Sequence, residues 1–75
     1  MKNNESASAA ADAQRIEGIA RMAEGIFESK DIALSWMWRE NIALGNARPI
    51  ELCGTDVGAA QVRRVLSAIE YGSPV

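Results

Sequence analysis

Residues 55–72, with the sequence TDVGAAQVRRVLSAIEYG, predict an amphipathic helix together with both of its ends. Thr55 is a good N-cap residue, and Asp56 in the first turn suits the positive end of the helix dipole. The helix is expected to run from Asp56 to about Tyr71, because Gly72 is typical of the position just past a helix end. One face is apolar, since hydrophobic residues recur there at helical spacing, namely Val62, Val65, Leu66 and Ile69.

Gly58 lies on the same apolar face, one turn before Val62. A glycine at the centre of a buried helix face lets another backbone approach closely, because no Cβ atom stands in the way. We therefore expect a close backbone contact at Gly58.

A longer helix is expected before this one, over residues 9 to about 27, preceded by a disordered or frayed segment at 1–8. Its apolar stripe comprises Ala13, Ile16, Ala20, Ala23 and Phe27, with Ile19 and Ile26 beside it. Gly18 and Gly25 lie roughly opposite the stripe. They are either tolerated surface glycines or the place where a second helix approaches closely.

The second expected helix begins after an N-cap at Ser29 and runs from Lys30 to about Arg39. It is apolar on two sides, because Leu34 and Trp38 lie on a different face from Ala33, Trp36 and Met37. Two readings stay open for Leu34 and Trp38. They either complete the core or anchor an interface with another chain, a role in which tryptophan is enriched.

Residues 41–48 predict a loop with a turn or cap signal at Gly45-Asn46. Pro49 suits the first position of a short helix that reaches about Cys53, and Gly54 ends it. No alternating strand pattern occurs. The sequence therefore predicts an all-α domain over residues 9–75, a small bundle of three main helices plus one short helix.

The composition argues against an enzyme. With no histidine and one cysteine among 75 residues, the chain can form neither a Cys/His nucleophile pair nor a Cys/His metal site. We expect no catalytic residues, no metal and no cofactor, and we expect Cys53 to be a small core residue. No signal peptide or membrane span is indicated, so a cytoplasmic protein without a membrane partner is expected.

The charge and size of the chain bear on its partners. A net charge of −2 disfavours nucleic-acid binding by this chain alone, although Arg48, Arg63 and Arg64 could form either a basic patch or a solvated face. A domain near this size buries only about 60% of its unfolded surface. We therefore expect a homodimer or a higher homo-oligomer, with Leu34 and Trp38 as candidate interface residues.

The run from Ala33 to Gly72 resembles the toxin-binding domain of Xre/MbcA/ParS antitoxins. In that family an Ala precedes a Trp by three residues, and an Asn-x-Ala-Leu-Gly segment, a Pro with an acidic-Leu pair, and spaced small and apolar residues follow. The matching residues are Ala33, Trp36, Asn41, Ala43, Leu44, Gly45, Pro49, Glu51, Leu52, Thr55, Gly58, Val62, Leu66, Ile69 and Gly72. Glu40 and Ile42 stand where the family often has prolines, and Trp38 lies outside the pattern.

The resemblance implies a function. Such antitoxins bind a co-encoded RES-domain toxin that consumes NAD+, and the C-terminal end of the antitoxin plugs the toxin's active site. Carried over, the toxin-binding residues are Tyr71, Gly72, Ser73, Pro74 and Val75. Many members also carry an N-terminal helix-turn-helix domain, for which this chain has no room. Two alternatives remain, a fragment of a DNA-binding transcriptional regulator and a structural homo-oligomerisation module.

Overall fold

The computed structural model describes the backbone of residues 2–72 and the side chains of residues 10–72. Within this part the chain forms α1 (Lys2–Phe27), α2 (Lys30–Trp38), the 3-10 turn η1 (Ile42–Leu44), α3 (Pro49–Leu52) and α4 (Asp56–Glu70). No strand occurs among these residues. The predicted all-α class is therefore confirmed, with three main helices and one short one.

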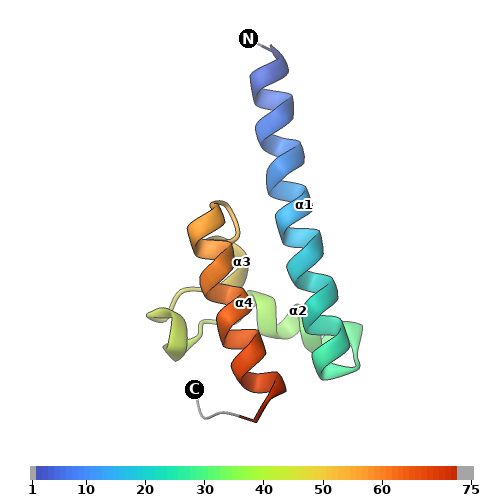
Figure 1. The fold of residues 1–75 in the computed structure, drawn as a ribbon, viewed down its shortest axis with the longest axis vertical. Helices are drawn as coiled ribbons and strands as arrows, with labels where there is room; N and C mark the ends of the chain where they lie inside the picture. Colours follow the sequence, from blue (N-terminus) through green and yellow to red (C-terminus); the bar gives the residue numbers. More distant parts are fainter. Residues whose placement is uncertain (1, 73–75) are drawn as a thin grey trace.

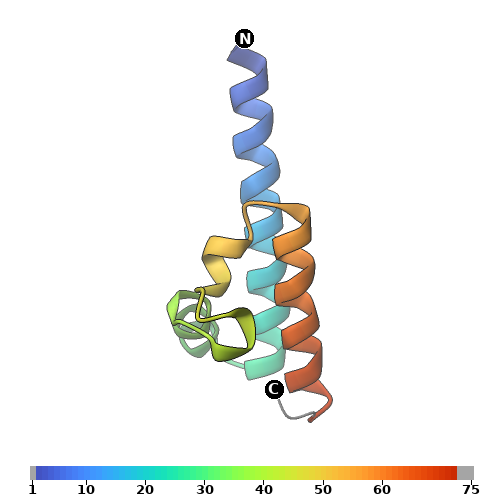
Figure 2. The same ribbon diagram turned by 90° about the vertical axis from the view of Figure 1, so that its left-hand side faces the viewer.

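The long helix α1 and the final helix α4 lie beside each other, and α2 runs across them (Figure 1). The segment that carries η1 packs against α4 and lies away from α1 in the view of Figure 1. The N-terminal part of α1 projects beyond all other elements in both views, which gives an elongated outline of 45 × 24 × 18 Å (Figure 2). The packed part of the molecule thus involves only the C-terminal part of α1.

The helix ends follow the local signals in the sequence. The Ser29 side chain accepts a hydrogen bond from the Ile32 amide at 3.2 Å, which caps α2. Pro49 occupies the first position of α3, where its missing N–H costs nothing. At the end of α4, Gly72 adopts a left-handed backbone with φ 76° and donates to the Ile69 carbonyl at 3.1 Å.

The first helix differs from the expectation at its start and along its stripe. It begins at Lys2 instead of near residue 9, which follows because extending a formed helix through an alanine-rich stretch costs little. Ala13 was expected on the buried stripe but is exposed. The stripe becomes buried only from Ile16 onward, where α2 and α4 pack against α1. The expectation that residues 1–8 are disordered or frayed stays a prediction.

The core lies where α1, α2 and α4 meet. Its small members, Ala23, Ala33 and Ala59, let the helices approach closely, and larger side chains fill the remaining space. The core cluster consists of Ile19, Ala23, Ala33, Met37, Cys53, Ala59, Val62 and Leu66. At its edge the rings of Phe27 and Trp36 contact each other with centroids 5.9 Å apart. The predicted apolar faces of all three main helices therefore meet in one core.

The sharpest steric contact is the one expected at Gly58. A Cβ atom built on this residue would lie 2.0 Å from the carbonyl oxygen of Leu52, an atom of the α3 backbone. Thr55 accepts a hydrogen bond from the Gly58 amide at 3.0 Å and begins α4 at the same place. Any side chain at position 58 would therefore force the α3 backbone to shift from its place at this corner.

Gly18 and Gly25 behave differently, because no atom outside their local backbone lies within 4 Å of a Cβ atom built on either. Among the described residues, no other element comes within contact distance of them. The structure of the single chain therefore supports the first interpretation, in which Gly18 and Gly25 are tolerated surface glycines.

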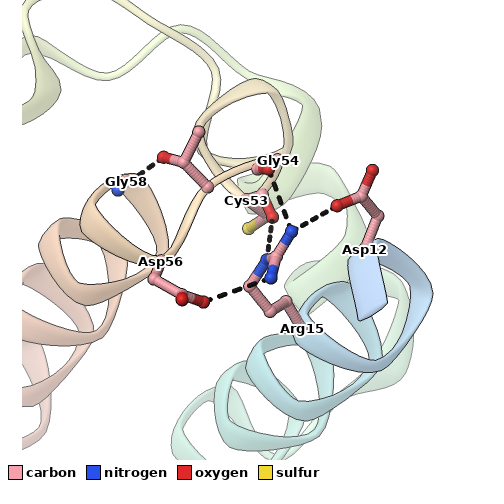
Figure 3. A network of polar contacts seen from close by, with 7 residues as sticks. Asp12, Arg15, Cys53, Gly54, Asp56 and Gly58 are labelled. Carbon is pink, nitrogen blue, oxygen red and sulfur yellow. Dashed lines mark hydrogen bonds and ion pairs between the residues drawn. The ribbon is translucent and has the colours of Figure 1, made fainter. Parts of the chain in front are cut away.

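Arg15 ties α1 to the corner between α3 and α4 (Figure 3). Its guanidinium donates to the carbonyls of Cys53 at 3.1 Å and Gly54 at 3.0 Å. It also pairs with Asp56 at 3.1 Å and with Asp12 in its own helix. These carbonyls follow the end of the short helix α3, so a charged donor satisfies acceptors that would otherwise bond only to water. We call this set of contacts the Arg15 clamp.

Substituting Gly58 tests the corner. Gly58→Ala should destabilise the fold by about 1–3 kcal/mol, because the new methyl group overlaps a backbone oxygen. The same change at Gly18 should stabilise it by about 0.5–1 kcal/mol, because alanine has the higher helix propensity and the space is open. Urea unfolding followed by circular dichroism measures both, and equal effects at the two positions would contradict the packing described.

Removing the Arg15 clamp should also destabilise the fold. Arg15→Ala loses charge-assisted hydrogen bonds between elements far apart in the chain, which corresponds to about 1–2 kcal/mol. The control is Arg21→Ala, because Arg21 forms only an exposed pair with Glu17 at 3.9 Å, worth less than about 0.5 kcal/mol. If thermal unfolding shows the same loss of stability for Arg15→Ala and Arg21→Ala, the Arg15 clamp contributes no more to stability than an exposed surface charge.

Candidate protein-interaction surfaces

Cys53 is the one side chain whose chemistry might have suggested an active site, and it is fully buried. Its thiol donates to the Pro49 carbonyl at 3.3 Å. Burial raises the pKa of the Cys53 thiol, and the positive charges of Arg63 and Arg15 only partly offset this effect. A buried, protonated thiol is a poor nucleophile, so Cys53 has the structural role that the sequence predicted.

Leu34 and Trp38 lie outside the core, on the side of α2 that faces solvent. Their side chains are 43% and 58% exposed, whereas Ala33 and Met37 on the neighbouring face are buried. They are four residues apart, so they share one side of the helix. Of the two readings left open, the core reading is therefore wrong for the single chain, and an apolar surface of α2 stays available to a partner.

Ile32 is also exposed, at 55%, but it lies on a different side of α2 from Leu34 and Trp38. The sequence reasoning gave it no role. Because it resembles Leu34 in size and exposure, it offers a matched control for any role assigned to the Leu34 and Trp38 side.

A second exposed surface follows α4 along the side next to its buried face. Its residues recur at helical spacing, so they stand one above another. We call it the outer stripe of α4, and it consists of the exposed residues Val57, Gln61, Arg64 and Tyr71 together with the half-buried Ala68. Val57 and Tyr71 are 72% and 80% exposed and place a large apolar and an aromatic side chain at the two ends of the stripe. Tyr71 and Arg64 are candidate binding residues from the sequence, whereas Val57, Gln61 and Ala68 were not predicted to belong to a binding surface.

The middle of the outer stripe borders an open hollow between α4 and η1, which we call the η1 hollow. The hollow is lined by Ala43, Leu44, Gly45, Gln61, Arg64 and Val65. Its wall on the η1 side is held by Asn41, whose side chain accepts from the Ala43 amide at 2.9 Å. The Asn41 amide donates to the Ala47 carbonyl at 3.1 Å and closes the loop. The backbone after η1 turns through Gly45 and Asn46, both left-handed, so the predicted turn at these residues is confirmed.

The three arginines that could have formed a basic patch have different surroundings. Arg48, Arg63 and Arg64 are all exposed. Arg63 and Arg64 are successive residues and therefore project about 100° apart around the helix. Arg64 lines the hollow, whereas Arg63 lies close enough to Cys53 to affect the pKa of its thiol. Among the described side chains, none pairs with Arg64 in a salt bridge.

The predicted toxin-binding residues begin at the far end of the outer stripe. Tyr71 and Gly72 directly follow α4 and are exposed. Ser73, Pro74 and Val75 lie outside the described residues. The two described members therefore extend the outer stripe, and the position of the other three stays open.

None of the helices in the described part of the chain is long and apolar enough to span a membrane. The curated proteins include no match to the chain. A family model, the antitoxin Xre/MbcA/ParS C-terminal toxin-binding domain, matches residues 22–72, from the C-terminal part of α1 to the glycine that ends α4. The match covers the η1 hollow, the outer stripe of α4 and every residue of the core cluster except Ile19. The chain therefore belongs to the family of Xre/MbcA/ParS antitoxin C-terminal toxin-binding domains.

Proposed function

We propose that this chain neutralises a RES-domain toxin that consumes NAD+, and that it does so without catalytic activity of its own. The observation that carries the proposal is the family match, which ends at Gly72, at the start of the predicted tail. In the proposed mechanism, the tail enters the toxin's substrate pocket and keeps NAD+ out. A cytoplasmic location fits this role, because the lone cysteine is unpaired and the substrate of the toxin is an intracellular cofactor.

The structure offers a physical route for such a tail. Tyr71 leaves a helix of 15 residues whose direction is set by the core and by the Gly58 corner. A segment that starts from a rigid element is positioned by it, so less orientational freedom is lost on binding. Pro74 further restricts the free tail and reduces the ordering cost. Tyr71 would supply the apolar and hydrogen-bonding contact nearest to the helix.

We further propose that the chain self-associates through Leu34 and Trp38. Their exposure on α2 leaves an apolar surface on a domain that is small enough to have marginal stability alone. Tryptophan buries a large area and is common among residues that dominate binding energy. The proposed oligomer interface on α2 and the proposed toxin contact at the end of α4 belong to different elements, so both could be occupied together.

Deleting residues 73–75 tests the tail mechanism. The truncated chain should fold with unchanged helicity, because α4 ends at Glu70 and is capped before the deletion. It should lose most of its ability to suppress NAD+ consumption by the toxin encoded in the neighbouring gene. The full chain is the control in the same assay, and complete neutralisation by the truncated chain would rule out the plug.

Substituting Trp38 tests the oligomer interface. Trp38→Ala should shift the chain toward monomer in sedimentation equilibrium while circular dichroism stays unchanged, because the side chain is outside the core. Ile32→Ala, an exposed change on another side of α2, should leave self-association unaltered. Loss of helicity in Trp38→Ala, or an equal shift in both variants, would remove the basis for the interface.

A further inference from the structure

The outer stripe of α4 contains a cation at the edge of an open hollow. Arg64 lines the hollow together with Leu44, Val65 and Ala43, and no carboxylate lines it. No described side chain forms an ion pair with Arg64, whereas Arg15 and Arg21 both pair with carboxylates. The chain as a whole carries net negative charge, so this positive site is local.

Such a site favours a particular ligand chemistry. A guanidinium has a planar set of donors that matches a carboxylate in two-point geometry. Gln61, beside Arg64 on the same wall, adds an amide that can donate or accept one hydrogen bond. The floor of Leu44 and Val65 would accept the apolar part of the same segment. The hollow therefore fits an acidic side chain next to an apolar one.

The position of the hollow identifies which partner would supply that segment. Tyr71, the first residue of the proposed plug, stands on the same stripe as Arg64, two helical turns further on. A toxin that receives the tail must therefore lie against this end of α4, and the outer stripe is the side of the helix that continues from Tyr71. Tyrosine and arginine are also the residue types that most often dominate binding energy.

We propose that the outer stripe of α4 and the η1 hollow form a second contact with the toxin, in which Arg64 binds an Asp or Glu side chain of the toxin. This inference rests on the proposed toxin-binding function and adds to it a residue and a ligand chemistry. The tail blocks the substrate pocket, while the Arg64 contact supplies affinity and fixes the rotation of α4 relative to the toxin. The contact is separate from Leu34 and Trp38 on α2.

The test compares Arg64→Glu with Arg63→Glu in the full chain. The two variants have the same net charge and the same helix, and both positions are exposed, but only Arg64 lines the hollow. Binding is measured by isothermal titration calorimetry against the toxin encoded in the neighbouring gene, carrying a substitution that abolishes NAD+ consumption. Circular dichroism and sedimentation of each free variant verify its fold and oligomeric state.

Arg64→Glu should weaken toxin binding by at least about tenfold, and Arg63→Glu by less than about twofold. Equal losses in the two variants would overturn the proposal, because a general charge effect would then account for them. A change in the self-association of Arg64→Glu with unaltered toxin affinity would also overturn it, since the occupant would be a second copy of the chain. If the unsubstituted chain fails to bind the toxin, the proposed function itself fails, and this outcome is distinct from the other two.

Discussion

The absence of a side chain at Gly58 is the constraint on which the remainder of the domain depends. Because the α3 backbone passes where a Cβ atom would stand, α4 can begin directly beside the end of α3. Thr55 caps the new helix there, and Arg15 reaches from α1 to the carbonyls of the connecting residues. Arg15 thus connects α1 to the corner at which α4 begins. The direction of α4, and with it the placement of the outer stripe and of Tyr71, follows from that corner.

Much of this architecture could be predicted from the sequence, because local rules govern helix ends and apolar faces. Ser29, Pro49, Thr55 and Gly72 each mark a helix end through the geometry of their own backbone or side chain, and each end lies within a residue or two of its predicted place. Gly58 could be identified because it interrupts an otherwise apolar stripe. The signal in each case comes from residues within one or two turns.

The parts that could not be predicted depend on distant residues. Arg15 lies 38 residues from its acceptor Cys53, and nothing local distinguishes it from the exposed Arg21. The exposure of Ala13 depends on how far α4 extends along α1. The η1 hollow arises where the loop after α2 folds against α4, so Arg64 could be identified as a surface residue but not as its lining. The sequence could not decide whether Leu34 and Trp38 belong to the core or to an interface. A helix that is apolar on two sides does not reveal which side packs against the other helices of its own chain.

Different elements of the domain have different roles. The core and the Gly58 corner hold the shape, α2 carries the apolar surface proposed for self-association, and α4 carries both the proposed Arg64 contact and the start of the proposed plug. Because the proposed Arg64 contact and the proposed plug share one rigid helix, a contact that fixes the orientation of α4 at Arg64 would also fix the direction of the tail. Neutralisation in this account is a matter of positioned binding and needs no reactive group on the antitoxin.

The most direct test of the central claim is to measure NAD+ consumption by the toxin encoded in the neighbouring gene, alone and after co-purification with the full chain. The account predicts a stable complex in which NAD+ loss is suppressed. A well-folded chain that forms no complex, with undiminished NAD+ loss, would contradict it and would favour a structural oligomerisation role.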